Sequence, residues 1–547
     1  MKQITIVFLT LLSVVAGEFS NRGKQFLVNF IHGHVNSQTN DPIYHYLYVS
    51  SEEAGNITVE TRSTSSHQGY LQDFVLESMQ SSIIKVDENL SMSLGNRIEP
   101  KGVLVSATVE VAIYVTSRDS NGNPRESYTA LPVTALSTSY IVSALWTNPI
   151  LNVAAVQDGT TVDIRLNTSC PVFFNFNRKT YSSHDTIIVQ LDLFYVFQLE
   201  LPYDMNSNCD LGGTLVTSDK PVSVLSGSSR VVGNGACGYA VEQVIPVELW
   251  GNKFLVPDLY DISDYRIRIV AGHNGTDIFV TMNGEVSSGK TEIYFMNECG
   301  VMDLDVADRS SVSVVGSRGI SVTQYSLELA PFGINVHSRA HFGGNYTVTP
   351  LAHSLSYVTI LILTTAQDSF NINGKYPHLS MWSNLVGTIY STITIPLAAG
   401  QHRLEASEAF LAQVYGYAVS GTYGFTAGYI LDHLPSADLY VQRPYLPHHA
   451  TQGTTETRRT TLHNLPTTTV SSRSTDTPVT NTMSIPPSAS STTTPGCHDK
   501  PGISCQILET SLHICRDPVL SFKYCERFCN LCQPCSVLQP CIPIIGR

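Results

Sequence analysis

Cysteine is the most reactive residue type in this chain, and Cys237 lies where a reactive cysteine could be expected. It stands in the glycine-rich stretch SGSSRVVGNGACGYAVEQVIPVELWGNKFLVP, residues 226–257. A nucleophilic thiolate needs a neighbouring base and an electropositive setting. The nearest downstream histidine is His273, and distance along the sequence does not place it beside the thiol. A disulfide is therefore the favoured interpretation of Cys237.

The cysteine count supports pairing. The chain has 12 cysteines, of which four lie in the body and eight crowd between Cys497 and Cys541. In an oxidising compartment an even set of cysteines is expected to pair. For the body we predict Cys170–Cys209 and Cys237–Cys299, although four cysteines allow three connectivities and the other pairings stay open. The stretch at 226–257 is then a rigid corner between repeats, with Trp250 filling the junction.

Candidate metal ligands are few. His32 and His34 form an HxH pair, which a strand would place on one face, and His337 and His341 form a looser pair. Zinc needs a third ligand, and neither pair has a clear companion, so we expect surface or hydrogen-bonded histidines. DLYDISD and DLDVAD hold spaced acids but lack the glycine and bidentate glutamate of an EF-hand loop. We predict no metal and no cofactor.

The sequence contains no nucleotide-binding loop, no recognisable catalytic acid pair and no GxSxG, so we predict that the protein is not an enzyme. Charged residues make up 14% of the chain and the net charge is −13. Average soluble proteins have about 25% charged residues. With no basic cluster, nucleic acid is excluded as a partner, because phosphate binding needs clustered Lys and Arg.

The first residues predict the compartment. MKQITIVFLTLLSVVAG places Lys2 before a short apolar run and ends on small residues, which is typical of a signal peptide at 1–17. A buried first strand is the alternative. No later apolar run is long enough for a membrane span, and CIPIIGR is too short for a GPI signal. We expect a secreted, extracellular protein.

The body, residues 18–442, alternates apolar and polar residues in short runs, which predicts antiparallel strands. A strand–turn–strand unit recurs four times: YLYVSSEEAGNITVETRS, ILNVAAVQDGTTVDIRL, YRIRIVAGHNGTDIFVTM and YVTILILTTAQDSFNINGK. Its turns hold Gly55, Gly159, Gly275 and Asp368. Another strand follows each unit, as in KGVLVSATVEVAIYV and KPVSVLSGSSRV. We predict an all-β fold of about four tandem β-sandwich-like repeats, with less than about a tenth of the body in helix.

The composition changes after the body. Residues 443–496 are rich in Thr, Ser and Pro, which indicates a disordered, mucin-like stalk, or else a bare flexible linker. The last segment is too short and too rich in cysteine for an ordinary core, so disulfides must hold it. Zinc at the CxxC of Cys529 and Cys532 is the competing interpretation.

Two resemblances follow from these residues. The spacing of Cys497, Cys505, Cys515, Cys525, Cys529 and Cys532, with Asp499, is similar to the ShK-toxin-like (ShKT) domain, here 497–532. The resemblance implies Cys497–Cys532, Cys505–Cys525 and Cys515–Cys529, with an Asp499–Arg527 salt bridge. Cys535 and Cys541, in a tail at 533–547, are left to pair with each other. Channel-blocking members use a Lys-Tyr pair, and Lys523-Tyr524 is displaced from the position of that pair.

The body resembles the N-terminal domain of the IgG Fc-binding protein family over about residues 22–432. The matching pieces include GKQFLVNF, ESYTALPV, SDKPVSVLSGSSR, EQVIPVELWGNKFLVP, DYRIRIVA and VYGYAVSGTYGFTAGY. The resemblance implies a secreted, mucus- or adhesion-associated protein that is not an enzyme. The von Willebrand D-type repeats that accompany this domain in mucus proteins are missing, so gel-forming assembly does not carry over.

The sequence thus predicts a secreted glycoprotein that binds an extracellular protein, glycoprotein or cell surface. A secreted enzyme, or a protease-associated inhibitory protein with an accessory ShKT module, is the alternative, and a channel-blocking toxin is a third. N-glycosylation sequons lie at Asn56, Asn89, Asn167, Asn274 and Asn345. We expect Tyr-rich loops on one rigid rod of repeats to bind with modest salt dependence, at hairpin tips near Gly159, Gly275 and Asp368.

Overall fold

The computed structural model describes residues 20–431, except 32–41, 64–67, 145–147, 169–173, 202–208, 233–236, 263, 284–289, 308, 328–330, 353 and 419–420. Within these residues all strand pairing between named strands is antiparallel, and every helical segment is a short 3-10 helix: η1 (Glu88–Leu90), η2 (Val133–Ala135), η3 (Val247–Leu249), η4 (Arg339–His341), η5 (Thr364–Ser369) and η6 (Leu379–Met381). The all-β prediction is confirmed. The stalk at 443–496, the ShKT-like segment and the tail lie outside the described residues.

The first repeat is one seven-stranded sheet ordered β4-β3-β7-β2-β5, with β1 and β8 also paired to β7. Its strands are β1 (Arg22–Val28), β2 (Tyr44–Ser51), β3 (Gly55–Thr61), β4 (Leu71–Leu76), β5 (Ser81–Val86), β7 (Val103–Arg118) and β8 (Pro124–Thr129). The long strand β7 bridges the sheet because its first half pairs with β3 and its second half with β2. One strand therefore serves both halves of the repeat.

The second repeat follows the same plan in an eight-stranded sheet ordered β14-β11-β16-β10-β15-β6, with β9 and β17 also paired to β16. Its strands are β6 (Arg97–Glu99), β9 (Ser137–Ile141), β10 (Pro149–Ala155), β11 (Thr160–Arg165), β14 (Thr186–Leu191), β15 (Val196–Glu200), β16 (Leu215–Val232) and β17 (Cys237–Gln243). A separate hairpin joins β12 (Phe174–Phe176) to β13 (Lys179–Tyr181). Here β16 is the long shared strand.

The third repeat splits its shared strand in two, which gives two four-stranded sheets ordered β18-β23-β20-β21 and β22-β19-β24-β25. The strands are β18 (Lys253–Val256), β19 (Tyr265–Ala271), β20 (Thr276–Asn283), β21 (Thr291–Met296), β22 (Val301–Val306), β23 (Ser311–Gly316), β24 (Ile320–Ser326) and β25 (Gly333–Val336). Gly275 between β19 and β20, like Gly159 between β10 and β11, has a positive φ, at +67° and +63°. These are the Asn-Gly and Asp-Gly turns expected from the sequence.

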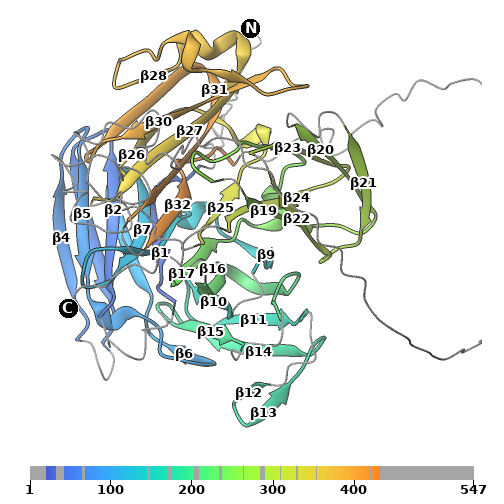
Figure 1. Cartoon of the computed structure of the whole chain (residues 1–547). Coiled ribbons are helices and arrows are strands. Elements are labelled where there is room, and N and C mark those ends of the chain that lie inside the picture. The colour runs from blue at the N-terminus through green and yellow to red at the C-terminus, as the bar shows by residue number, and fades with distance from the viewer. Residues whose placement is uncertain are drawn as a thin grey trace, which may run out of the picture. The chain divides into compact units, whose positions relative to one another are not determined.

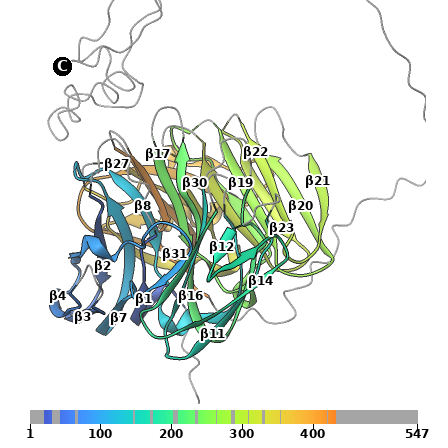
Figure 2. The ribbon, with the colours of Figure 1, turned by 90° about the horizontal axis from the view of Figure 1, so that it is seen from below.

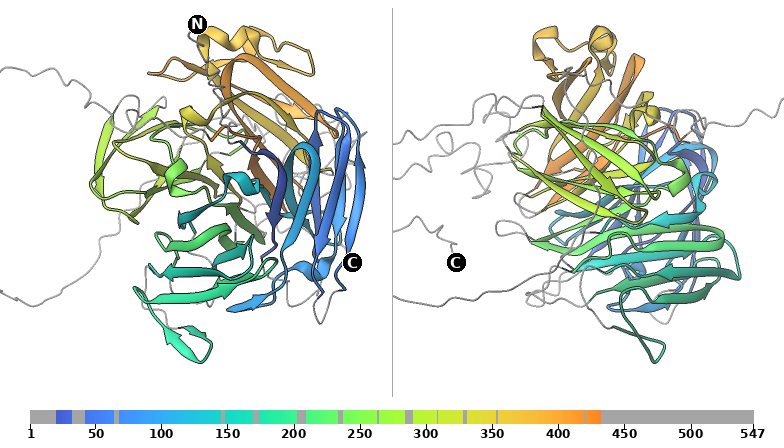
Figure 3. Two further views of the ribbon diagram at one scale, coloured as in Figure 1. Left: turned by 180° about the vertical axis from the view of Figure 1, so that it is seen from behind. Right: turned by 90° about the vertical axis from the view of Figure 1, so that its right-hand side faces the viewer.

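The fourth repeat returns to a single long strand, β31 (His402–Tyr417), in a sheet ordered β26-β31-β27-β30-β29 with β28 and β32 also paired to β31. The other strands are β26 (Gly343–Val348), β27 (Leu355–Leu363), β28 (Asn371–Ile372), β29 (Ser383–Asn384), β30 (Tyr390–Leu397) and β32 (Thr422–Thr426). Figure 1 shows the four repeats arranged around a common centre, and Figure 3 shows the same arrangement from behind.

The repeats close into a ring rather than extending as the rod expected from the sequence. β8, β17, β25 and β32 lie innermost, where β8 packs against β17 and β32, and β25 packs against the same two strands. The ends of the body meet, because the backbone of Ser20 bridges to Ile430 and the Asn21 N–H donates to the Tyr429 carbonyl at 3.2 Å. Figure 2 shows the first repeat at one side and β20 and β21 of the third at the other.

The hydrophobic cores of neighbouring repeats merge at the junctions. Tyr48 and Tyr114 of the first repeat lie in the core of the fourth, and Tyr415 and Tyr417 of the fourth lie in the core of the third. The Tyr114 hydroxyl, fully buried, donates to the carbonyls of Thr347 at 2.9 Å and Ala427 at 2.5 Å. The fourth repeat thus shares core side chains with the first and the third, whereas one core cluster is built from second-repeat residues alone.

Candidate functional site

The glycine-rich stretch at 226–257 forms the end of β16, then β17, η3 and β18, and so lies at the junction of the second and third repeats. A Cβ on Gly227 would stand 1.9 Å from the Ala240 carbonyl oxygen, so only glycine allows β16 and β17 to pair there. Trp250 is 4% exposed, packs with Ile141 and Val270, and donates from Nε1 to the Ile245 carbonyl at 2.9 Å. The prediction that Trp250 fills the junction is confirmed.

A small cavity of about 30 Å³ lies beside Trp250. Its lining includes Ser226, Glu242, His337, Ser338 and His341, which come from β16, β17 and the segment after β25. Both ring nitrogens of His337, Nε2 of His341 and the two serine hydroxyls are buried without a hydrogen-bond partner. A buried water needs roughly 10–15 Å³ and several polar partners, so the cavity has room for about two.

Burial shifts the pKa of each ionisable group of this cavity towards its neutral form. It raises the pKa of the Glu242 carboxyl well above its usual value, although a hydrogen bond from the Asn335 backbone lowers it in part. Burial, and then the neighbouring His341, lower the pKa of His337 well below 6.5. Burial also lowers the pKa of His341 to about 4, against a raising effect of its hydrogen bond with the Leu249 backbone. The two histidines are therefore neutral at pH 7, and neutral polar groups of this kind can order water.

The histidine expectations have different outcomes. His337 and His341 are neither at the surface nor fully hydrogen-bonded, because both are buried with ring nitrogens that have no partner. Both are buried because the segment that follows β25 packs beside Glu242 and Trp250, at the junction of the second and third repeats. Their ring centroids are 6.2 Å apart. His32 and His34 lie outside the described residues.

The predicted Cys237–Cys299 disulfide is wrong, because Cys299 is a free cysteine. The two residues are kept apart by β16. Cys299 lies at the start of β16, because its carbonyl accepts a hydrogen bond at 3.3 Å from the Asn167 side chain, which contacts Gly213 and Thr214. Cys237 lies at the other end of β16, where it pairs with Val232. A disulfide needs Cα atoms within about 7 Å. Burial raises the pKa of the Cys299 thiol, against the effect of Arg165 at 3.8 Å, which does not favour a thiolate nucleophile.

Cys209 is disulfide-bonded, and its predicted partner Cys170 lies outside the described residues. The eight cysteines from Cys497 to Cys541 lie there as well, so their pairing remains a prediction.

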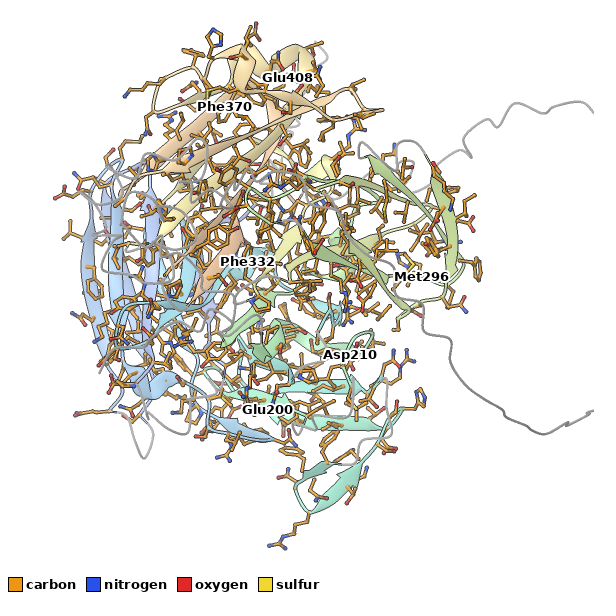
Figure 4. The ribbon with its side chains drawn as sticks, in the orientation of Figure 1. Glu200, Asp210, Met296, Phe332, Phe370 and Glu408 are labelled. Carbon is orange, nitrogen blue, oxygen red and sulfur yellow. The ribbon has the colours of Figure 1, made fainter. Side chains whose placement is uncertain are left out.

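Two of the spaced acids of DLDVAD, Asp303 and Asp305, form ion pairs with arginines. Arg268, 1% exposed, donates to Asp303 at 2.7 Å and to Asp210 at 2.9 Å, which links the second repeat to the third. Arg266, two residues earlier, donates to the exposed Asp305 at 2.5 Å. In Figure 4 the Asp210 label lies between the strands of the second repeat and those of the third. Among the described residues no three His, Cys, Asp or Glu side chains are grouped as metal ligands.

The rim of the ring carries the exposed apolar side chains. The densest group lies in the segment between β28 and β30, next to the tip at Asp368, and we call it the rim loop: Tyr376, Leu379, Met381, Val386 and Ile389, each 51–66% exposed. Others lie on the edge strands β4, β14 and β21: Leu71, Val75, Ile188, Ile293 and Phe295. Exposed apolar patches of this kind mark interaction surfaces. The tips at Gly159 and Gly275 carry none of these side chains, and apolar rim residues were not predicted from the sequence.

The five sequons differ in exposure. Asn56, Asn89, Asn274 and Asn345 are exposed, and Asn167 is half-buried. Nothing in the described part of the chain is a helix long and apolar enough to cross a membrane.

Comparison with known proteins gives a family. The model of the family described as IgGFc binding protein matches residues 126–416. The human IgGFc-binding protein is 24% identical over 354 residues, which are 61% of this chain and 6% of that protein. The chain thus spans only a small part of the length of the curated relative.

Two solved structures align with much of this chain, but their superposition on it is poor. A major pilin of Streptococcus pyogenes covers 74% of this chain and 98% of its own, at 6% identity and a TM-score of 0.14. A tandem-repeat region of a large adhesion protein covers 70% of this chain and 93% of its own, at 12% identity and a TM-score of 0.09. These scores are too low to carry an argument.

Proposed function

The chain belongs to the IgGFc-binding protein family, and from this premise we propose that it is a secreted glycoprotein that binds extracellular glycoproteins or cell surfaces without catalysing a reaction. The expected signal peptide, stalk and ShKT-like module are part of this proposal. The family name refers to immunoglobulin Fc, so Fc is one candidate ligand and a heavily glycosylated secreted protein such as mucin is the other.

The rim loop is the observation that carries the proposal. Five large apolar side chains of this short segment are exposed to water. Their exposure has an unfavourable solvation free energy, and these side chains add little to the hydrophobic core. A tyrosine with one apolar face and one polar end is well suited to contact a partner surface. The only formally charged side chain between β28 and β30 is Lys375, so binding here should depend little on salt.

The test is binding of the secreted full chain to two immobilised probes, human IgG Fc and purified mucin, at low and high salt. We expect at least one probe to bind. We expect the triple variant Tyr376→Ser, Leu379→Ser, Met381→Ser to weaken that binding by roughly tenfold or more, since it removes the apolar contacts.

The matched control is Ile188→Ser, which removes an equally exposed apolar side chain from β14, away from the rim loop. It should leave binding unchanged, and both variants should unfold at the wild-type denaturant concentration. If neither probe binds the wild-type chain, or if the triple variant binds as the wild type does, the proposal is wrong.

A further inference from the structure

The edge strand β4 exposes two apolar side chains, on either side of Asp73, that the ring does not cover. Val75 is 73% exposed and Leu71 is 65% exposed. β4 ends its sheet, and so one side of its backbone has no strand partner within the described sheet. Exposed apolar edge strands are prone to pair with other chains, and natural proteins protect them with charges, bulges or a covering element. A secreted protein needs such protection on β4.

The strand register supplies a candidate cover. Asn56 on β3 lies directly opposite Val75, and Thr58 lies opposite Asp73. Residues opposite each other in an antiparallel pair extend from the same face with Cβ atoms about 5 Å apart. Asn56, Ile57 and Thr58 form an N-glycosylation sequon. The asparagine side chain is exposed, while its backbone N–H is held by the Thr108 hydroxyl at 2.9 Å.

Asn167 shows what an unsuitable sequon looks like. Its Nδ2, the atom to which a glycan is attached, donates to the carbonyls of Gly212 at 3.2 Å and Cys299 at 3.3 Å. A Cβ on Gly213 would lie only 2.4 Å from this nitrogen. A sugar on Nδ2 would displace these contacts between the second and third repeats. The folded protein therefore has no space for a glycan at Asn167.

We propose that Asn56 carries an N-linked glycan that lies over the outer face of β3 and β4 and covers Val75 and Leu71. The glycan acts as a covalent shield of the edge strand. In the attachment step, Nδ2 forms a bond to the anomeric carbon of a lipid diphosphate-linked oligosaccharide. The bond from that carbon to the diphosphate breaks, the lipid diphosphate leaves, and Nδ2 loses one proton. The inference rests on the secretion included in the proposed function.

The edge strand β21 provides the contrast. Its exposed Phe295 lies opposite Asp277, and Ile293 lies opposite Phe279, so no sequon faces either residue. The nearest sequon, Asn274, lies in the turn, where its Oδ1 accepts a hydrogen bond from the Glu298 backbone at 3.2 Å. A glycan at Asn274 extends from the turn, and the apolar face of β21 stays open.

The test uses the full chain secreted from eukaryotic cells. Glycopeptide mass spectrometry should find Asn56 occupied and Asn167 unoccupied. Light scattering should show Asn56→Gln forming roughly tenfold more soluble oligomers than the wild type. The double variant Asn56→Gln, Val75→Thr should form fewer oligomers than Asn56→Gln, because it removes one of the two apolar side chains that the glycan covers.

Two controls separate shielding from a folding defect. Thr58→Ser keeps the sequon and the hydroxyl that donates to Asp73, so it should behave as the wild type. Enzymatic removal of glycans from the folded wild type should reproduce the oligomers of Asn56→Gln. If the chain is secreted with Asn56 unmodified, or if deglycosylated protein stays monomeric, the inference is wrong and the proposed binding function is unaffected. If the cells retain the full chain instead of secreting it, the secretory assignment is wrong too.

Discussion

The centre and the rim of the ring distribute polar and apolar side chains in opposite ways. At the centre the side-chain amides of Gln243, Gln324 and Gln413 are buried, and they bond across neighbouring repeats: Gln243 accepts from the Leu131 N–H at 2.7 Å, and Gln413 donates to Gln324 at 3.3 Å. At the rim, valine, isoleucine and phenylalanine face water. Phe332, labelled in Figure 4, is one of the apolar side chains where the inner strands meet.

Buried hydrogen bonds at the centre and exposed apolar side chains at the rim indicate different roles for the two regions. Apolar contacts are non-directional, so a purely apolar centre would tolerate several ways of packing four similar sheets. Buried hydrogen bonds are directional, and breaking one leaves an unsatisfied group at a cost of about 1–3 kcal/mol. We infer that the centre specifies the closed ring and the rim provides contact surface. Changes at the centre should then alter stability, and changes at the rim should alter association.

The largest effect should come from the ion pair between the second and third repeats. Arg268→Ala removes a buried guanidinium and leaves Asp210 and Asp303 without it, so we expect a loss of about 3–5 kcal/mol in the free energy of unfolding. The matched control, Arg266→Ala, removes a pair with the exposed Asp305 and should cost about 0–1 kcal/mol. Chemical denaturation of both variants measures the difference, and equal costs would contradict the distinction.

Acid should weaken the centre through the histidines of the cavity. His341 is protonated near pH 6.5 when unfolded but only near pH 4 when folded, so its contribution to stability is present above pH 6.5 and is lost as pH falls towards 4. This loss amounts to about 3 kcal/mol. His337 acts in the same direction. Glu242 acts in the opposite direction, because its folded pKa is raised above 4.5 and its stabilising contribution declines as pH rises from there.

Thermal unfolding between pH 7 and pH 5 tests this balance. The melting temperature should fall as the pH is lowered, His341→Asn should flatten that fall, and Glu242→Gln should steepen it, because the opposing group is removed. A Glu242→Gln profile parallel to the wild type would mean that the carboxyl is ionised inside the folded protein.

A smaller effect is expected at the seam between the first and fourth repeats. Tyr114→Phe removes the hydroxyl that donates to Thr347 and Ala427, and it should cost about 1–3 kcal/mol. Tyr376→Phe, on the exposed rim loop, removes the same atom where water replaces it and should change little. Guanidinium unfolding of the two variants measures the free energy lost when one hydroxyl is removed from a buried seam and from the exposed rim.

The smallest change in stability should follow substitution of the uncovered edge strand. Ile293→Ser with Phe295→Ser should alter the free energy of unfolding by less than about 0.5 kcal/mol for each residue, since both side chains are more than 60% exposed. A larger loss would show that β21 belongs energetically to the core, and the division between centre and rim would fail.

The sequence predicted the local features of this fold because each has a local cause. Alternating residues predicted the strands, Gly159 and Gly275 predicted the tight turns, and the position of Trp250 between repeats predicted a filled junction. Closure of the ring could not be predicted in this way. Ser20 and Ile430 pair across almost the whole body, and no spacing or composition along the chain indicates that they meet.

The candidate sites follow the same rule. The sequons were visible as motifs, but only the folded structure distinguishes Asn56, which lies exposed opposite Val75, from Asn167, whose side-chain amide is already hydrogen-bonded. The cysteine pairing failed for a related reason. Cys237 and Cys299 are the next two cysteines along the chain, but β16 separates them in space, and neither the length nor the path of a strand is encoded at the cysteines.

The seam at Asn21 and Tyr429 has a consequence for synthesis. The chain is made from its N-terminus, and the first repeat emerges long before its last neighbour exists. Until β32 and Tyr429 leave the ribosome, the backbone N–H of Asn21 lacks its partner in the folded body, and the hydroxyl of Tyr114 lacks one of its two. Until then the nascent body is an open arc, and the first-repeat end of that arc is not yet covered by the fourth repeat. The ring can therefore close only after the whole body has been made, when the segment after β32 docks against the first repeat.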